Sequence, residues 1–414
     1  MLDYFRNRMK EGKEAVIVYL GGSITEGQGV EDKRLCWQGL VQSELERTYP
    51  ECRFSAFNAG IGGTDSRFGA FRMEKDVLCR RPDLLFIEFA VNDYTRPSQE
   101  IRESLEGILS KLWKAAPRCD VVFVLTATGK MMGENPDCLP ESVAVHMEVA
   151  GQYRIPWVNV GKRLFSRVAE GTALEELLPD GVHPNREGYQ IYFQGVWEFL
   201  WHVLEQKEAL LTESGREEAG CPEERGNLRT EIGREETSNL RTKIGREETN
   251  NLRTKIGREE TNNLRTKIGR EETESLRAET GRKAGKYTAC GMITASRARL
   301  QGFATEHIAM CGRYGSYVSS NRPGDFLEFT FQGDKIGLFY MISCDGGQME
   351  WALDGGDFKE LSAWDVYARS FDRGSARMLA ENLEFGEHRL CIRIAAGRDA
   401  ESKGNFIRIS DFLV

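Results

Sequence analysis

Histidine is scarce in this sequence of 414 residues, which contains only five. The ten cysteines are scattered between Cys36 and Cys391, and no two of them form a C-x-x-C pair. Zinc sites normally draw on closely spaced cysteine and histidine ligands, so this spacing argues against a metal centre. We expect no metal site, and reduced cysteines that are mostly buried as small apolar side chains.

Net positive charge and long apolar runs are also missing. The formal net charge is −8, which argues against a surface built to bind nucleic acid or another polyanion. The longest apolar run near the N-terminus, residues 15–20, is far too short to cross a membrane or to form the core of a signal peptide. We therefore predict a cytoplasmic protein that binds neither nucleic acid nor membranes.

The first of three regions, residues 1–210, alternates short apolar runs with longer amphipathic stretches. Such alternation is typical of an α/β domain, in which right-handed crossovers join a parallel sheet covered by helices on both faces. The apolar runs predict strands at 15–20, 54–57, 84–89, 121–125 and 157–160. The amphipathic stretches predict helices at 37–48, 68–79, 101–115, 141–153 and 187–204.

Residues 211–286 form a low-complexity region built on a twelve-residue repeat, of which LRTKIGREETNN is a full copy. Each full copy offers only one leucine and one isoleucine to a core, and its glycine costs a helix roughly 1 kcal/mol relative to alanine. Twelve residues advance about 120° beyond whole helical turns, so successive leucines spiral around a helix instead of forming a seam. The region predicts a solvated linker with transient helix, and the alternative is a repeat that binds a partner.

Residues 287–414 have the pattern of an antiparallel β-sandwich of jelly-roll type. Runs rich in β-forming residues lie at 326–331, 336–342, 348–353 and 388–394. Turns rich in glycine and aspartate separate these runs. The region is long enough for its own core, so the chain is predicted to contain two domains joined by the repeat linker.

Two glycine-rich turns follow the first and second predicted strands. Ser23 lies in the first, GGSITEG, and Gly63 lies in the second, NAGIGGTDS. Such turns can bind phosphate at a helix N-terminus, but neither G-x-x-x-x-G-K-[ST] nor G-x-G-x-x-G occurs here. They can equally hold a nucleophile at the end of a strand, bring backbone N–H groups to a ligand, or serve only as tight turns.

Two later segments carry polar side chains. Asn92 follows the third predicted strand, where it can cap a turn or direct its amide toward a developing negative charge. Asp180 precedes His183 by three residues in the segment LPDGVHP. A carboxylate at this spacing can accept the imidazole Nδ1–H and leave Nε2 facing outward as a base, although His183 can also be a plain surface residue.

These residues, in this order, resemble the sequence blocks of the SGNH, or GDSL-type, hydrolase superfamily. Ser23 matches the serine of block I, Gly63 the glycine of block II and Asn92 the asparagine of block III. The D-x-x-H of block V matches Asp180 and His183. The resemblance covers about residues 15–205, and implies a three-layer, flavodoxin-like α/β/α fold and a serine esterase that needs no metal or cofactor.

The resemblance also implies a role for each matched residue. Ser23 is expected to be the nucleophile, His183 its base and Asp180 the carboxylate that orients the base. The oxyanion hole is expected to consist of the backbone N–H groups of Ser23 and Gly63 and the side-chain amide of Asn92.

Two positions depart from the family pattern. Gly22 stands where the family has the aspartate of G-D-S, and Ala90 stands where a glycine is usual. Neither position supplies a nucleophile, a base or a side-chain donor. We therefore expect the chemistry to be kept, while the subgroup and its substrate stay open.

The substrate is predicted from the C-terminal region, which is similar to jelly-roll domains that accompany SGNH carbohydrate esterases. This similarity implies removal of small acyl groups, acetyl above all, from sugars or oligosaccharides. Trp351, Trp364, Tyr340 and Tyr367 can stack on sugar rings or belong to the sandwich core. The alternatives are an acylhydrolase of the lipase or lysophospholipase type, and a non-catalytic carbohydrate-binding protein on the same fold. The sequence does not predict the oligomeric state.

Overall fold

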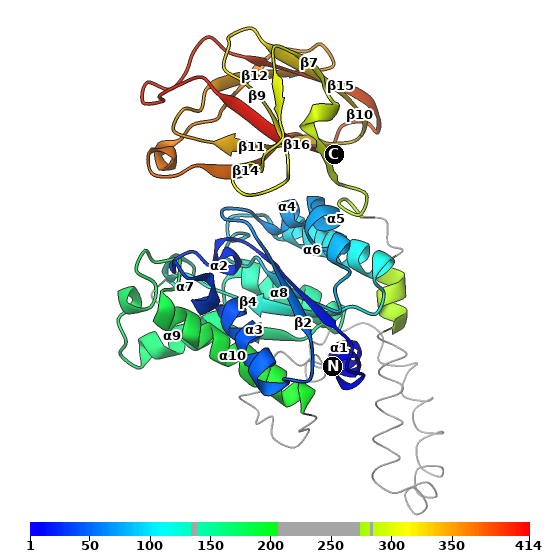
Figure 1. The fold of residues 1–414 in the computed structure, drawn as a ribbon, viewed down its shortest axis with the longest axis vertical. Helices are drawn as coiled ribbons and strands as arrows, with labels where there is room; N and C mark the ends of the chain where they lie inside the picture. Colours follow the sequence, from blue (N-terminus) through cyan, green and yellow to red (C-terminus); the bar gives the residue numbers. More distant parts are fainter. Residues whose placement is uncertain (134–138, 206–273, 282–284) are drawn as a thin grey trace, which may run out of the picture.

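A computed structural model describes residues 1–133, 139–205, 274–281 and 285–414. Figure 1 shows an α/β unit with a β-rich unit above it. Most of the predicted linker lies outside the described residues, but its part at 274–281 is a helix, and Arg277 in this helix donates to Asp120 Oδ1 at 2.9 Å. Among the described residues, no helix is both long and apolar enough to span a membrane.

Five parallel strands form the sheet of the α/β unit, in the order β2-β1-β3-β4-β5. Their bounds are β1 Ala15–Gly21, β2 Phe54–Gly60, β3 Leu84–Glu88, β4 Asp120–Leu125 and β5 Trp157–Asn159. The predicted α/β class and all five predicted strands are confirmed, and the strand order is that of flavodoxin-like folds. Every residue of β3 and β4 is buried, because helices cover both faces of the sheet.

The helices of this unit divide between the two faces of the sheet. The longer ones are α1 Asp3–Lys10, α3 Trp37–Thr48, α6 Ser98–Ala115, α8 Glu141–Gln152, α9 Val160–Ala169 and α10 Arg186–Leu204. The short ones are α2 Ser23–Glu26, α4 Ser66–Phe71, α5 Met73–Asp76 and α7 Gly129–Met132, with 3-10 turns η1 Lys33–Leu35, η2 Leu78–Arg80 and η3 Leu174–Glu176. Ser23 is the first residue of α2, which is a single helical turn.

The predicted helix at 68–79 is wrong as one continuous element, because Arg72 divides it into α4 and α5. The backbone of Arg72 leaves the helical conformation, with φ −91° and ψ 5°. Its guanidinium is completely buried and donates to the carbonyl oxygens of Gly21 and Ala59. These two carbonyls end strands β1 and β2, so the break in the helix lets one side chain hold the strand ends together.

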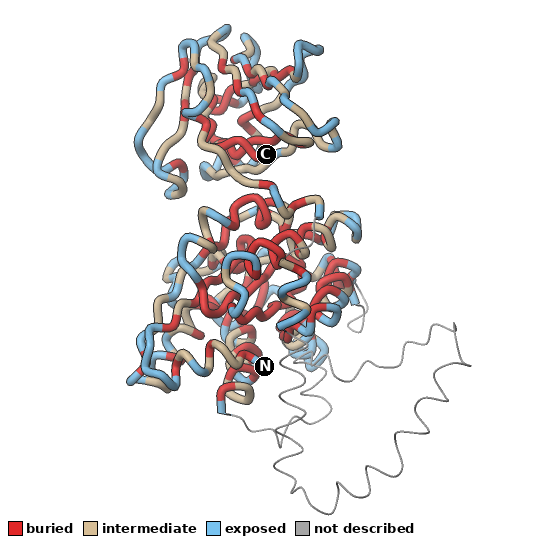
Figure 2. The backbone as a smooth tube through the Cα atoms, turned by 90° about the vertical axis from the view of Figure 1, so that its right-hand side faces the viewer, coloured by how far each residue is buried: buried red, intermediate tan, exposed pale blue. Residues whose placement is uncertain are grey.

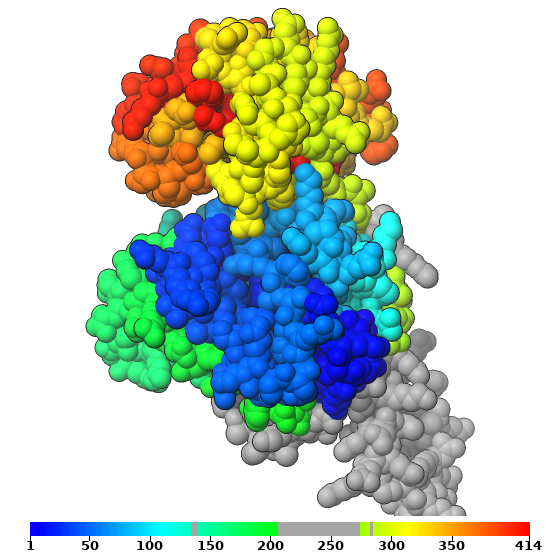
Figure 3. All heavy atoms as spheres, in the orientation of Figure 1, coloured from blue at the N-terminus to red at the C-terminus, as the bar shows by residue number. Residues whose placement is uncertain are grey.

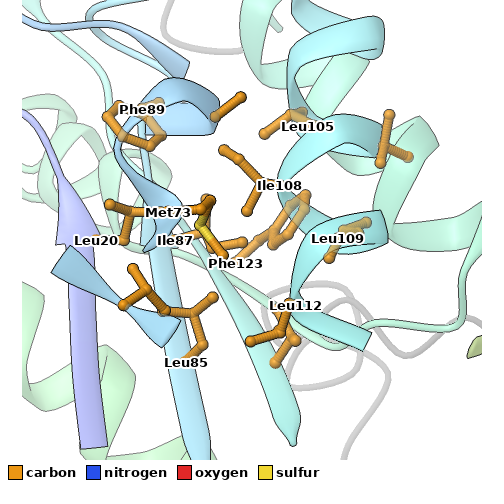
Figure 4. Packing of buried hydrophobic residues seen from close by; sticks show 14 of the residues in the cluster. Leu20, Met73, Leu85, Ile87, Phe89, Leu105, Ile108, Leu109, Leu112 and Phe123 are labelled. Carbon is orange, nitrogen blue, oxygen red and sulfur yellow. The ribbon is translucent and has the colours of Figure 1, made fainter. Parts of the chain in front are cut away.

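Alternate residues of each strand pack into two apolar clusters, one on each face of the sheet. Val18 and Leu20 of β1 face the cluster that includes α4, α6 and α8, and Figure 4 shows Leu20 and its neighbours packed against α6. Ile17 and Tyr19 face the cluster that includes α1, α3 and α10. Figure 2 shows the buried residues in the interior of the α/β unit and of the C-terminal unit, with exposed residues around them. This packing holds the carboxyl ends of the strands, where the site lies, on a rigid base.

The C-terminal unit consists of two packed antiparallel sheets, as predicted. One has the order β13-β12-β15-β10-β7 and the other β14-β11-β16-β9-β8, with β6 paired to β16. The predicted strands correspond to β10 Phe326–Gly333, β11 Ile336–Ile342, β12 Gln348–Leu353 and β15 Gly386–Ile394. The other strands are β6 Met292–Thr294, β7 Arg299–Gln301, β8 Ala304–Glu306, β9 Tyr317–Ser320, β13 Lys359–Ser362, β14 Arg373–Ala380 and β16 Ile407–Leu413.

The aromatic residues singled out in the sequence divide between the sandwich core and its surface. Trp351, Trp364 and Tyr340 are buried in the core cluster of the sandwich. Tyr367 lies in the 3-10 turn η6 Val366–Arg369 and is 63% exposed. Of the four, only Tyr367 therefore presents most of its ring to solvent.

The two units pack directly against each other. Phe339 of β11 stacks on Phe68 of α4 with 5.0 Å between ring centroids. Tyr287, Met310 and Phe339 belong to the same buried apolar cluster as the residues of α4 and α6. Figures 1 and 3 show the sandwich seated over the α4–α6 side of the α/β unit. The interface is therefore continuous with the core of the α/β unit.

Candidate active site

Ser23, His183 and Asp180 form a continuous chain of hydrogen bonds. Ser23 Oγ lies 2.8 Å from His183 Nε2, and His183 Nδ1 lies 2.6 Å from Asp180 Oδ2. A carboxylate can only accept, so Nδ1 carries the hydrogen and Nε2 is left to accept the hydroxyl hydrogen of Ser23. Ser23 is 6% exposed and the imidazole 20% exposed, which leaves the chain of contacts open to solvent at one side.

Asp180 is fixed by the backbone of its own loop. Its Oδ1 accepts the N–H groups of His183 at 2.7 Å and of Val182 at 2.9 Å. Partial burial acts to raise the pKa of Asp180, but these hydrogen bonds and the contact with the imidazole lower it below its usual value. The carboxylate is therefore ionised at neutral pH and available to the imidazole.

The loop that carries His183 is anchored on both sides. Asn185 caps α10 by accepting the N–H of Gly188 at 3.0 Å, and its amide donates to Glu176 O at 2.7 Å. On the other side, the carbonyl oxygen of Pro184 lies 2.2 Å from the position that a Cβ of Gly29 would take. Gly29 also has a φ of +94°, so both space and backbone conformation require glycine there. These contacts bring His183 to Ser23 from 160 residues along the chain.

Asn92 packs directly against the turn that carries the nucleophile. A Cβ added to Gly22 would lie 2.0 Å from Asn92 Oδ1 and 2.7 Å from its Cγ. Gly22 has a φ of −91°, so space rather than conformation excludes a side chain at this position. The departure from G-D-S thus has a physical reason, because an aspartate at residue 22 would displace Asn92.

Two backbone N–H donors of the predicted oxyanion hole, those of Ser23 and Gly63, donate no hydrogen bond within the described part of the chain. The buried Oδ1 of the Asn92 side-chain amide has no partner there either. Gly63 is exposed and has a φ of +69°. Unpaired donors at a strand end can stabilise a negative charge, so these groups stay the candidates for an oxyanion hole.

Glu88 lies completely buried beneath the nucleophile turn and was not predicted from the sequence. Its carboxyl accepts hydrogen bonds from Thr25 Oγ1 at 2.8 Å and Thr126 Oγ1 at 2.6 Å. Burial raises the pKa of Glu88 to about 7, although these hydrogen bonds act to lower it. A charged residue at the end of the otherwise apolar run of β3 is the signal that could have identified it.

Replacing Glu88 by glutamine is expected to change stability in a pH-dependent way. The stability of the variant minus that of wild type should be larger at pH 8 than at pH 5. The folded protein keeps the Glu88 proton up to about pH 7, whereas the unfolded chain releases it near 4.5. In wild type, the stability that depends on this proton is fully present below pH 4.5 and is lost as the pH rises past 7. At about 1.4 kcal/mol per pKa unit, the wild type loses roughly 3 kcal/mol. Thermal melting of both proteins at the two pH values measures the change. An equal difference in Tm at both would contradict it.

Asp93 and His146 form a second buried pair, directly after Asn92. Asp93 Oδ1 accepts the N–H of Ser66 at 3.0 Å, and its Oδ2 lies 3.4 Å from His146 Nε2. Burial raises the pKa of Asp93 to about 8 and lowers that of His146 to about 4. Both groups are therefore uncharged at neutral pH, and Asp93 Oδ2 and His146 Nε2 make no hydrogen bond within the described residues. The hydrogen bond from Ser66 to Asp93 Oδ1 is the contact that fixes the segment next to Asn92.

In the described residues, no group of three or more histidine, cysteine, aspartate or glutamate side chains could hold a metal ion. The eight cysteines in these ranges are all unpaired, and four of them are buried. The buried ones are Cys36, Cys52, Cys119 and Cys290. The arrangement described above can activate a hydroxyl and stabilise an oxyanion with protein groups alone.

Comparison with family models matches residues 19–191 to the GDSL-like lipase/acylhydrolase family. This range contains Ser23, Gly63, Asn92, Asp180 and His183. A comparison with curated proteins found no match.

Solved structures share the fold over nearly the whole chain. A two-domain esterase named CEX, active on acetylated mannans and co-crystallised with mannopentaose, matches with a TM-score of 0.69 and 21% identity, covering 98% of this chain and 92% of that one. A second structure of the same esterase has a TM-score of 0.70 at 21% identity, covering 99% and 94%. An acetylxylan esterase from Geobacillus stearothermophilus, Axe2, has a TM-score of 0.39 at 20% identity and covers 44% of this chain and 93% of its own.

Proposed function

We propose that this carboxylic ester hydrolase, whose residues 19–191 form a domain of the GDSL-like lipase/acylhydrolase family, is a serine esterase that removes acetyl groups from carbohydrates. The observation that carries the proposal is the unbroken chain of contacts from Asp180 through His183 to Ser23. A hydroxyl at a strand end, an imidazole that can take its proton and a carboxylate that orients the imidazole are the parts that acyl transfer needs.

In the proposed reaction, Ser23 Oγ attacks the carbonyl carbon of the acetyl ester and His183 Nε2 takes the hydroxyl proton. The negative charge on the carbonyl oxygen is stabilised by the N–H groups of Ser23 and Gly63 and by the amide of Asn92. The tetrahedral intermediate then breaks its bond to the sugar oxygen, which receives the proton from His183. Water attacks the acetyl-enzyme in the same way, gives a proton to His183 and releases acetate as Ser23 recovers its hydrogen.

The carbohydrate part of the proposal draws on the two-domain architecture. The solved two-domain esterase that shares the fold over nearly the whole chain is active on acetylated mannans. The sandwich of this chain also exposes aromatic rings that can stack on sugars, since Tyr367 is 63% exposed and Phe371 is 49% exposed. The guanidinium of Arg373 lies 5.6 Å from the centroid of the first ring and 6.0 Å from that of the second, a distance at which a cation attracts an aromatic ring.

Acetate release from acetylated manno- and xylo-oligosaccharides tests the proposal, with p-nitrophenyl acetate, butyrate and octanoate measured alongside. We expect acetate release from the oligosaccharides, and a kcat/KM that falls steeply from the acetate ester to the octanoate. A preference for octanoate would instead support a lipase-type acylhydrolase. A folded protein that binds the oligosaccharides but cleaves no ester would support a non-catalytic binding protein.

A further inference from the structure

A tight loop of the sandwich, residues 310–314, reaches into the α/β unit. Its ends close on each other, with Arg313 N–H donating to Met310 O at 2.9 Å. Cys311 and Tyr314 adopt left-handed backbone conformations, with φ values of 50° and 45°. Residues other than glycine rarely adopt this backbone conformation, and they keep it where surrounding contacts hold the backbone in place. Figure 3 shows the yellow segment of the sandwich touching the blue surface of the α/β unit.

Tyr314 anchors the loop on the α/β unit. Its hydroxyl donates to Asp76 Oδ2 at 3.1 Å, and its ring meets the edge of Phe339 at 5.4 Å between centroids. The ammonium of Lys75 lies 5.1 Å from the same ring. The residue next to Tyr314 is therefore held in a defined position.

That residue, Arg313, contacts the last residue of β2 and the last residue of α2. Its Nη2 donates to the carbonyl oxygen of Gly60 and lies 3.5 Å from Glu26 Oε1. The side chains of Arg313 and Glu26 are 25% and 32% exposed, so most of the contact is removed from water.

Glu26 also contacts the segment that ends in Gly63. Its Oε2 accepts the N–H of Gly62 at 3.0 Å, and a Cβ at Gly62 would lie 2.8 Å from the same oxygen. Glu26 is also the last residue of α2, the single turn that begins with Ser23. One carboxylate thus joins the nucleophile turn, the Gly62 backbone and a guanidinium from the other domain.

The loop needs such support because three of the four residues at 60–63 are glycines. Glycine has the most backbone freedom to lose, so a glycine-rich loop is poorly ordered by its own sequence. Arg72 holds the carbonyl oxygen of Ala59 from within the α/β unit. The next carbonyl along the chain, that of Gly60, is held by Arg313 from the sandwich.

We propose that Arg313 is a positioning residue for ester hydrolysis, through which the C-terminal sandwich sets the Gly63 N–H against the oxyanion. The inference rests on the proposed function, because it assigns Gly63 to the oxyanion hole. A misplacement of about 1 Å can cost a hundredfold in rate, and an oxyanion donor works only in a narrow range of distances. The sandwich then contributes a positioning residue to the site in the other domain.

The test compares full-length wild type, Arg313→Ala, Arg313→Lys and Glu381→Gln. Glu381→Gln is the matched control, because Glu381 Oε2 makes another ion pair across the domain interface, to Arg67 Nη1 at 2.9 Å, without touching the 60–63 loop. The measurements are kcat and KM for p-nitrophenyl acetate, the inhibition constant of phenylboronic acid and the Tm. The boronic acid forms a tetrahedral adduct with a serine nucleophile, so its affinity reports on the oxyanion hole.

Arg313→Ala is expected to lower kcat by roughly 10- to 100-fold, with KM within about 2-fold of wild type. Boronate binding by Arg313→Ala should weaken by a similar factor. Arg313→Lys should have a kcat much closer to that of wild type than Arg313→Ala has. Glu381→Gln should keep kcat within about 2-fold of wild type. Suppose that the wild type is active and Ser23→Ala is inactive. If Arg313→Ala then matches Glu381→Gln in kcat and in boronate binding, the role of Arg313 is overturned while the proposed function stands. An inactive wild type overturns the proposed function and this inference together.

Discussion

Replacing His183 by alanine is expected to lower kcat by roughly 10⁴- to 10⁶-fold while KM stays close to that of wild type. Among the described residues, the imidazole of His183 is the group that contacts Ser23 Oγ as a proton acceptor, at 2.8 Å. Without it the hydroxyl is a weak nucleophile, because nothing removes its proton as the bond to carbon forms. Initial rates with p-nitrophenyl acetate over a range of concentrations give both constants.

The control for this prediction is Asp180→Asn, which keeps the shape of the side chain but can donate to Nδ1. We expect a smaller loss than for His183→Ala, because the base remains but its tautomer is no longer set. The double variant with both His183→Ala and Ser23→Ala should have a kcat little below that of either single variant, because both residues act in the same step. A His183→Ala variant that keeps more than a tenth of the wild-type kcat would contradict its role as the base.

Replacing Asn92 by alanine is expected to lower kcat by roughly 100- to 1,000-fold, the usual cost of one oxyanion donor. The amide lies against Gly22 of the nucleophile turn, and its Oδ1 has no hydrogen-bond partner within the described residues. The interaction forms only as charge develops on the carbonyl oxygen, so KM should change little. Steady-state kinetics on the acetate ester measure both quantities, and a melting curve shows whether the fold is kept.

Gly22→Ala provides a second approach to the same side chain. Its φ of −91° suits alanine, but the new methyl group would lie 2.0 Å from Asn92 Oδ1 and push the amide away. We therefore expect Gly22→Ala to lower kcat as well, and to have little further effect when Asn92 is already alanine. If Asn92→Ala left kcat unchanged, the residue would not belong to the oxyanion hole.

The pattern of apolar residues was enough to predict the α/β sheet. Strands buried on both faces are continuous apolar runs, and the five runs correspond to β1–β5. The break at Arg72 could not be predicted, because its cause is a pair of carbonyl oxygens at the ends of β1 and β2. In the sandwich, short strands such as β7 and β8 were missed because they are partly exposed and carry no apolar alternation.

The candidate site was predictable to the extent that Ser23, Gly63 and Asn92 follow strand ends and that Asp180 and His183 share one short, distinctive segment. The structure brings Ser23, Asp180 and His183 together, and it places Asn92 against Gly22. Contacts between residues of different helices, strands or domains could not be predicted in this way. Arg313 lies 253 residues from Gly60 and in the other domain, so only the folded chain reveals that the two meet.

The role of Ser23 in carbohydrate deacetylation can be tested by the rate of acetate release from an acetylated manno-oligosaccharide by wild-type protein and by Ser23→Ala, both as full-length chains. We expect the wild type to release acetate at a rate that saturates with substrate concentration. We expect Ser23→Ala, folded to the same Tm within a few degrees, to release acetate no faster than the buffer blank. Equal release by both proteins would contradict the assignment of Ser23 as nucleophile, and no release by a folded wild type would contradict the proposed substrate.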